Sequence, residues 1–192
     1  MLYYLLDSSA YVKAIIDKDK PSKFKHNFID EAKNGNAFLY MPQFCVAEVL
    51  NVFAKLYIAP ESKSESITEF QYKELCKLFR SQICYRYTIY IYDLHRYHNL
   101  CVDKLYLNEL SANLRKKDKE RVDGDPFKKR FVGGLDLLII AMSYELRKTY
   151  ADEKKDRIIL LSTDTGLIEV ANSFYKENKL KNISAENIFF IK

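Results

Sequence analysis

The sequence predicts an α/β fold in which helices cover both faces of a parallel sheet of about five strands. Short apolar runs of strand length alternate with longer amphipathic segments along the whole chain, and this alternation is typical of parallel sheets. The first run, residues 2–6, is apolar at every position, as a central strand buried on both faces would be. Of the 192 residues, 48% are hydrophobic, so a single domain with a substantial core is expected over residues 1–192.

In the first half of the chain, cap and turn residues separate the expected elements. The strand at 2–6 is followed by a helix at 8–16, which either of two serines can cap. A proline opens a second helix at 21–34 and a glycine follows it, which is the usual placement of these two residues. A short strand is expected at 37–40, and a proline then starts a long helix at 43–57.

The middle of the chain contains a strand between two helices and then a strongly charged segment. A polar break precedes an amphipathic helix at 67–82, and residues 87–92 are β-branched and aromatic, as in a strand. Asp93 is suited to cap a helix that runs to about residue 110. Residues 111–134 lose apolar periodicity and carry more basic than acidic side chains.

The last part of the chain repeats the alternation of helix and strand. Residues 135–149 form the most hydrophobic helix, 157–161 a strand, 165–175 a helix and 187–191 a final strand. Ligands of such sheets bind at the carboxyl ends of the strands. Polar residues at those ends are therefore the candidates for a functional site.

Two of the predicted strands end beside an aspartate that has hydroxyl neighbours. Asp7 directly follows the first strand and precedes Ser8 and Ser9, and Asp164 follows Ser162 after the fourth strand. Each aspartate could equally be the N-cap of the next helix, because Asp is a preferred cap. Taken alone, neither decides between a cap and a functional carboxylate.

Two further acids lie among apolar residues. Glu48 is in an otherwise apolar part of the helix at 43–57, although Asn51 and Lys55 could join it in a narrow solvated stripe. Asp136 is in the first turn of the most hydrophobic helix, where the helix dipole alone favours an acid by about 0.3–1 kcal/mol. Charged side chains rarely enter apolar surroundings without a partner. A cleft therefore explains both acids better than a solvated helix face.

Together, the four acids predict a metal centre. If Asp7, Glu48, Asp136 and Asp164 converge at one edge of the sheet, they repel and raise one another's pKa. A hard cation relieves this repulsion, and oxygen ligands favour Mg²⁺ or Mn²⁺. A metal held by carboxylates can activate water and stabilise the leaving oxygen of a phosphodiester, so a metal-dependent hydrolase of nucleic acid is expected.

These motifs resemble those of PIN-domain ribonucleases and are similar to the toxin nucleases of VapBC pairs. The resemblance rests on Leu6–Val12, on Ala47–Val49 inside a helix, on Leu135–Ala141 and on Leu161–Asp164. It implies a three-layer α/β/α fold with the sheet order 3-2-1-4-5. It also implies cleavage of single-stranded RNA that depends on Mg²⁺ or Mn²⁺.

The resemblance also assigns roles to individual residues. Asp7, Glu48 and Asp136 match the core metal ligands of the family, and Asp164 matches its more variable fourth acid. Two supporting residues match as well: Ser8 is the small residue after the first acid, and Ser162 is the hydroxyl residue two before the fourth. Asp93 follows the third strand, but the implied sheet order places it at the edge, so it is interpreted as a cap.

The family resemblance further implies partners for the chain. These are RNA, an antitoxin protein and a second copy of the chain, with the helices at 43–57 and 67–82 as the dimer surface. The chain is longer than the compact toxins, with extra residues around 60–85 and 111–134, and this leaves the toxin role open. The net charge of +5 permits an anionic partner. Unless the charged segment is only a solvated loop, its basic residues would bind the RNA backbone, and the candidates are Lys116, Lys117, Lys128, Lys129 and Arg130.

Cysteine usage and hydropathy predict a cytoplasmic protein. The four cysteines form no C-x-x-C pair, so we expect reduced thiols, with Cys45 buried. The longest apolar run, Leu137–Met142, is far shorter than the roughly 18 residues of a membrane span, and the first residues do not resemble a signal peptide.

The main alternative is a catalytically inactive PIN-fold module that binds RNA or protein, in which the acids are only caps and solvated groups. A second candidate metal site is formed by His95 and His98, which are three positions apart on a predicted helix. The sequence shows no Cys or acid that completes a ligand pattern there, so both are interpreted as ordinary helix histidines.

Overall fold

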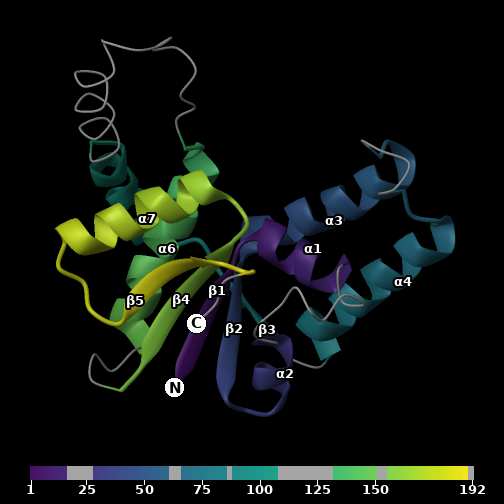
Figure 1. Cartoon of the computed structure of the whole chain (residues 1–192), viewed down its shortest axis with the longest axis horizontal. Coiled ribbons are helices and arrows are strands. Elements are labelled where there is room, and N and C mark those ends of the chain that lie inside the picture. Colours follow the sequence, from purple (N-terminus) through teal and green to yellow (C-terminus); the bar gives the residue numbers. More distant parts are fainter. Residues whose placement is uncertain (17–27, 61–65, 86–87, 108–131, 151–154, 190–192) are drawn as a thin grey trace, which may run out of the picture.

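The computed structural model describes residues 1–16, 28–60, 66–85, 88–107, 132–150 and 155–189. Its centre is a five-stranded sheet in which all pairs are parallel and the order is β3-β2-β1-β4-β5 (Figure 1). The predicted α/β fold and the order 3-2-1-4-5 are therefore confirmed. The strands are β1 (Leu2–Leu6), β2 (Ala37–Pro42), β3 (Ile89–Tyr92), β4 (Arg157–Ser162) and β5 (Ile183–Asn187).

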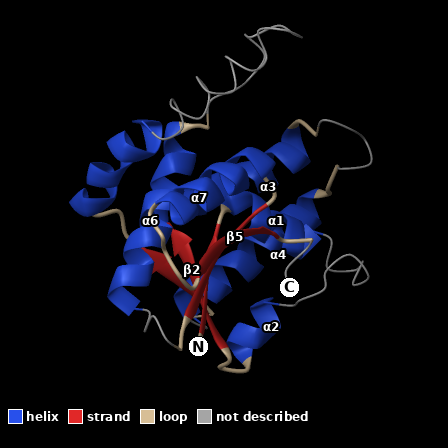
Figure 2. Ribbon diagram, turned by 60° about the vertical axis from the view of Figure 1, so that its left-hand side comes forward, coloured by secondary structure: helices blue, strands red, loops and turns tan. Residues whose placement is uncertain are grey.

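Helices cover both faces of the sheet, which lies between them in Figure 2. On one face, Tyr4 of β1 packs against Phe28 of α2, with ring centroids 6.1 Å apart. On the other face, Tyr40 of β2 packs against Tyr150 of α6 at 5.8 Å. The helices are α1 (Ser8–Ile16), α2 (Phe28–Lys33), α3 (Gln43–Ile58), α4 (Glu69–Arg80), α6 (Gly134–Tyr150) and α7 (Thr165–Glu177), and residues 96–107 are also helical.

The first strand lies at the centre of the core, as its uniformly apolar sequence predicted. Leu5 of β1 has Tyr40 of β2 and Leu160 of β4 as its neighbours in register. Leu5 and Leu6 are completely buried. Because β1, β2 and β4 are adjacent and parallel, their carboxyl ends meet at one edge of the sheet.

One predicted helix end is confirmed, and a second helix begins at a cap residue that was not predicted. Gly35, predicted to follow the second helix, has a φ of +75°, the left-handed conformation that glycine adopts most easily after a helix. Thr68 caps α4 in a capping box with Gln71. Beyond α4 the chain continues as a short π-helix at Ser81–Tyr85, which the amphipathic pattern did not predict.

The last strand was placed wrongly. It lies at Ile183–Asn187 and not at 187–191, because pairing with β4 places the strand and not the stronger apolar character of the residues that follow. In β5 only Ala185 is fully buried, as expected for an edge strand. Its polar residue Glu186 pairs with Arg157 of β4, and Ile188 is buried in the turn that follows.

One predicted helix begins later than expected. Residues 93–95 are not helical and the helix begins at residue 96. The His95 N–H donates to Nδ1 of His98 at 2.9 Å, and this bond satisfies a backbone donor at the helix start. The first half of the helix predicted at 21–34 lies outside the described residues. Across the described segments, no helix has both the length and the apolar character that crossing a bilayer requires.

Candidate functional site

The four predicted carboxylates come from four elements that meet at the carboxyl edge of the sheet (Figure 1). Asp7 follows β1, and Asp164 lies between β4 and α7. Glu48 is in the second turn of α3, which begins directly after β2. Asp136 is in the first turn of α6, the helix that precedes β4.

Asp7 is a buried carboxylate that hydroxyl groups hold in place. The residue is only 6% exposed. Oδ2 accepts hydrogen bonds from Ser9 Oγ at 2.6 Å and from Ser162 Oγ at 2.7 Å, and Oδ1 accepts one from Ser8 Oγ at 3.2 Å. No described backbone N–H donates to this carboxylate, so Asp7 does not act as the side-chain cap of α1.

Glu48 lies beside Asp7 and a buried thiol. One ligand atom from each of Asp7, Cys45 and Glu48 lies within 4.8 Å of the other two. Glu48 is partly buried, whereas Asn51 and Lys55 are exposed, so these three do not form a solvated stripe. Glu48 therefore lies beside the Asp7 carboxylate and is less exposed than the two polar residues that follow it on the helix.

Cys45 is buried as predicted, but its place beside the carboxylates was missed. Burial raises the pKa of the Cys45 thiol, the charges of Asp7 and Glu48 raise it further, and the backbone N–H of Ser8 opposes them. The available signal was the spacing of Cys45 and Glu48, because residues three apart share one face of a helix. All four cysteines are free thiols.

Asp136 is electrostatically coupled to the other three acids. Burial is the main cause that raises the pKa of its carboxyl group, and the charges of Asp7, Asp164 and Glu48 raise it further. The Gly133 N–H donates to Asp136 Oδ2 at 3.1 Å and lowers this pKa. The charges of the other three acids therefore act on the Asp136 carboxyl group.

Asp164 is the N-cap of α7, as one of its two interpretations predicted. Its Oδ1 accepts the backbone N–H groups of Gly166 at 2.7 Å and Leu167 at 3.1 Å. Its side chain is exposed. The cap does not exclude a second role, because both bonds use the same oxygen.

Each of the three aspartates is anchored mainly through one oxygen. Asp7 and Asp136 are held through Oδ2, and Asp164 through Oδ1. The second oxygens of Asp136 and Asp164 have no hydrogen-bond partner in the described part of the chain, and that of Asp7 has only the longer bond from Ser8. Carboxylates held in this way can offer one oriented oxygen each to a ligand.

The carboxylate oxygens of the cluster are donors that suit a hard divalent cation, although the thiol of Cys45 lies beside them. Within the described segments, none of the four acids forms an ion pair with a lysine or arginine. This holds even for Asp7, which is buried, and for Glu48, which lies partly buried beside it. A cation would relieve this uncompensated charge, and carboxylate oxygens suit Mg²⁺ or Mn²⁺. Asp136 and Asp164 do not join Asp7 and Glu48 within 4.8 Å, so the second pair lies farther from that ligand group.

Both serines that were predicted to support the site form hydrogen bonds with Asp7. Ser162 bonds Asp7 as expected, whereas Ser8 makes only the longer bond to Oδ1. Ser9, which was not predicted to support the site, makes the shortest hydrogen bond to Asp7. The predicted RNA-binding residues are Lys116, Lys117, Lys128, Lys129 and Arg130, and they lie outside the described residues.

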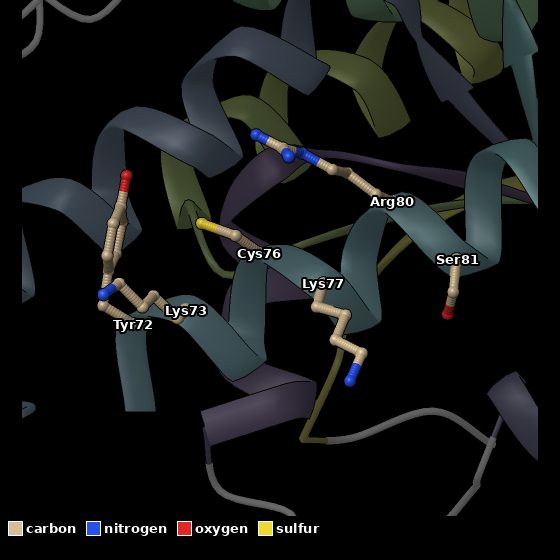
Figure 3. A pocket seen from close by; sticks show the side chains of 6 residues that line it. All are labelled: Tyr72, Lys73, Cys76, Lys77, Arg80 and Ser81. Carbon is tan, nitrogen blue, oxygen red and sulfur yellow. The ribbon is translucent and has the colours of Figure 1, made fainter. Parts of the chain in front are cut away.

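A separate cavity of about 430 Å³ lies on α4, and none of the four acids lines it (Figure 3). Its basic side chains include Lys73 and Lys77, which pair with Glu69 and Glu74 of the same helix. The lining residues are Tyr72, Lys73, Cys76, Lys77, Arg80 and Ser81. The cavity is therefore not part of the carboxylate cluster.

No protein-family model matches the sequence, and no curated protein matches it either.

Proposed function

We propose that this chain is a metal-dependent endoribonuclease that hydrolyses phosphodiester bonds of single-stranded RNA with Mg²⁺ or Mn²⁺. The observation that carries the proposal is the environment of Asp7. This residue is 6% exposed at the end of the central strand, and its charge, with those of Glu48 and Asp164, raises the pKa of Asp136. So much negative charge without a described basic partner is best explained by a bound cation.

In this proposal the acids would bind the metal ion, and Ser162 orients one of these acids. Asp7 and Glu48, whose ligand atoms lie within 4.8 Å of each other, would hold the ion. Asp136 and Asp164 would direct their unanchored oxygens toward the same edge. Ser162 keeps the Asp7 carboxylate in one orientation. When bound, the metal supplies a Lewis acid for the phosphoryl oxygen and lowers the pKa of a bound water.

RNA as the substrate and the partner proteins rest on the resemblance to PIN-domain ribonucleases. On that basis we also propose that the chain is the toxin of a toxin–antitoxin pair and forms a homodimer. A small antitoxin gene beside this reading frame, whose product copurifies with the chain, would support the toxin role. Sedimentation equilibrium of the purified chain tests the dimer separately.

The test of the proposed function is cleavage of a labelled single-stranded RNA by purified protein. We expect cleavage with Mn²⁺ or Mg²⁺ and none in EDTA. Asp7→Asn and Asp136→Asn should each abolish it, because a neutral amide is a poorer ligand for a hard cation. The matched control is Asp93→Asn, an exposed aspartate that follows β3 at the edge of the sheet, and it should cleave as the wild type does.

Two results would contradict the proposal. Cleavage that persists in EDTA or in Asp7→Asn would exclude this centre as its source. RNA binding without cleavage, unchanged by Mn²⁺, would instead favour the inactive binding module.

A further inference from the structure

Ser9 connects the Asp7 carboxylate to the turn that carries Asp164. Its Oγ donates to Asp7 Oδ2 at 2.6 Å and accepts the backbone N–H of Thr163 at 3.1 Å. Ser9 is the second residue of α1, whereas Thr163 lies between β4 and α7. One hydroxyl therefore links the start of one helix to the turn before another.

Ser162 makes the same kind of connection from the opposite side. Its Oγ donates to Asp7 Oδ2 at 2.7 Å and accepts the Asp164 N–H at 3.0 Å. The two serine oxygens are 3.4 Å apart. Two consecutive N–H groups of the turn are thus held by two hydroxyls that converge on one carboxylate oxygen.

The proton count determines which Asp7 oxygen remains open. A serine hydroxyl has one proton to donate, and the short distances indicate that both protons are directed at Oδ2. A carboxylate oxygen has about two lone-pair sites, so Oδ2 is saturated. Oδ1 keeps only the bond from Ser8 at 3.2 Å, which is long for a hydroxyl donor to a carboxylate.

We propose that Ser9 is a positioning residue of the metal centre, acting with Ser162 to present Asp7 to a divalent cation through Oδ1 alone. By holding the Thr163 N–H, Ser9 also fixes the turn whose next residue is Asp164. The inference rests on the proposed function, since it assumes that a divalent cation binds at Asp7. It assigns to Ser9 the role that the family pattern had suggested for Ser8.

The experiment measures Mn²⁺ affinity by isothermal titration calorimetry, without RNA. Ser9→Ala should bind Mn²⁺ about 10- to 100-fold more weakly, the usual effect of removing a group that orients a metal ligand. Ser9→Thr keeps the hydroxyl and should restore most of the affinity. Ser173→Ala, an exposed serine of α7, is the matched control and should bind as the wild type does. If Ser9→Ala does not fold, Ser9→Cys replaces it, because the thiol is a weaker donor of similar size.

A double-mutant comparison separates positioning from a purely structural role. In an Asp7→Asn background, Ser9→Ala should cause a much smaller further loss of Mn²⁺ affinity, because the ligand that it orients is already impaired and only its bond to the Thr163 N–H is still lost. Equal Mn²⁺ affinity of wild type and Ser9→Ala would overturn the inference about Ser9, even if Ser9→Ala melts at a lower temperature. Absence of Mn²⁺ binding by the wild type would instead overturn the proposed metal centre, and the Ser9 role with it.

Discussion

Ser162 Oγ donates a hydrogen bond of 2.7 Å to Asp7 Oδ2, although 155 positions separate the two residues. The parallel register of β1 and β4 brings them together, because Leu6 faces Leu161 and the next residue on each strand is Asp7 or Ser162. Ser162 is completely buried. The pairing of two apolar strands thus determines the orientation of a buried carboxylate.

Removing this hydroxyl should destabilise the fold. Ser162→Ala leaves the Asp164 N–H without its acceptor and Asp7 Oδ2 without one donor. Loss of a partner from buried polar groups typically costs about 1–3 kcal/mol, so we expect the free energy of unfolding to fall by that amount. Urea unfolding in EDTA measures it, with Ser173→Ala as the control. An unchanged midpoint would show that the hydroxyl contributes nothing to stability.

Neutralising Asp136 should have the opposite effect in the absence of metal. Burial and three neighbouring carboxylates disfavour its charge, while an asparagine at 136 could still accept the Gly133 N–H. We expect Asp136→Asn to raise the free energy of unfolding in EDTA by about 1 kcal/mol, the scale of partly screened repulsions. Urea unfolding at pH 7 measures the change.

Adding Mn²⁺ should make the wild type more stable than Asp136→Asn, the reverse of the order expected in EDTA. The ion should raise the melting temperature of the wild type more than that of Asp136→Asn, because it binds the folded state that offers all four carboxylates. Asp93→Asn is the control for the loss of one negative charge. If Asp136→Asn is instead less stable than the wild type in EDTA, the hydrogen bond from the Gly133 N–H to the Asp136 carboxylate outweighs the repulsion from the other three acids.

Most of the fold could be predicted because short stretches of sequence indicate each strand and several helix ends. The uniformly apolar β1 indicated a central strand, and proline, glycine and cap residues marked several helix ends. The last strand could not be predicted in this way. At an edge, β5 buries only Ala185 fully and owes its place to pairing with β4, whereas the more apolar residues that follow had the stronger local signal.

The residues that the sequence proposed for the candidate site were its four acids and the serines Ser8 and Ser162. Asp7, Glu48 and Asp136 are conspicuous because their sequence neighbours are apolar. Ser9 and Cys45 are not, since a serine near a helix start and a cysteine in a helix are common and their partners depend on tertiary packing. Asp164 shows the limit of a local interpretation, because it caps α7 and also contributes to the electrostatic environment of Asp136.

The side chain of Asn172 in α7 forms hydrogen bonds with the backbone of the edge strand β5. Its side-chain amide donates to the Ala185 carbonyl at 2.8 Å and accepts the Ala185 N–H at 2.9 Å. The side chain thus takes the place of a sixth strand at this point, and such cover protects an edge from pairing with another chain. Asn172→Ala should lower the free energy of unfolding by about 1–2 kcal/mol and increase aggregation on heating. Urea unfolding and light scattering measure these effects, with the exposed Lys176→Ala as the control. Wild-type values in both would contradict this role.

His98 is a buried histidine whose two nitrogens are both engaged. It is 1% exposed, its Nδ1 accepts the His95 N–H, and its Nε2 lies 3.3 Å from the Tyr92 hydroxyl. Burial lowers the pKa of His98 below its ordinary value of 6.5, and His95 lowers it further, whereas Glu145 raises it. Protonation would also break the bond at Nδ1, because an imidazolium has no acceptor.

Stability should therefore fall as the pH drops below about 6.5. Because the pKa of His98 is lower in the folded state, the unfolded chain takes up a proton at a higher pH than the folded chain does. The free energy of unfolding therefore falls between the unfolded-state pKa and the folded-state pKa, by up to about 1.4 kcal/mol per pH unit. His98→Asn keeps an acceptor near the position of Nδ1 but cannot titrate. The difference in unfolding free energy between wild type and His98→Asn should be constant above pH 7 and should shrink from pH 6.5 to 5, as measured by urea unfolding. A difference that does not change with pH would show that His98 takes up its proton equally in both states.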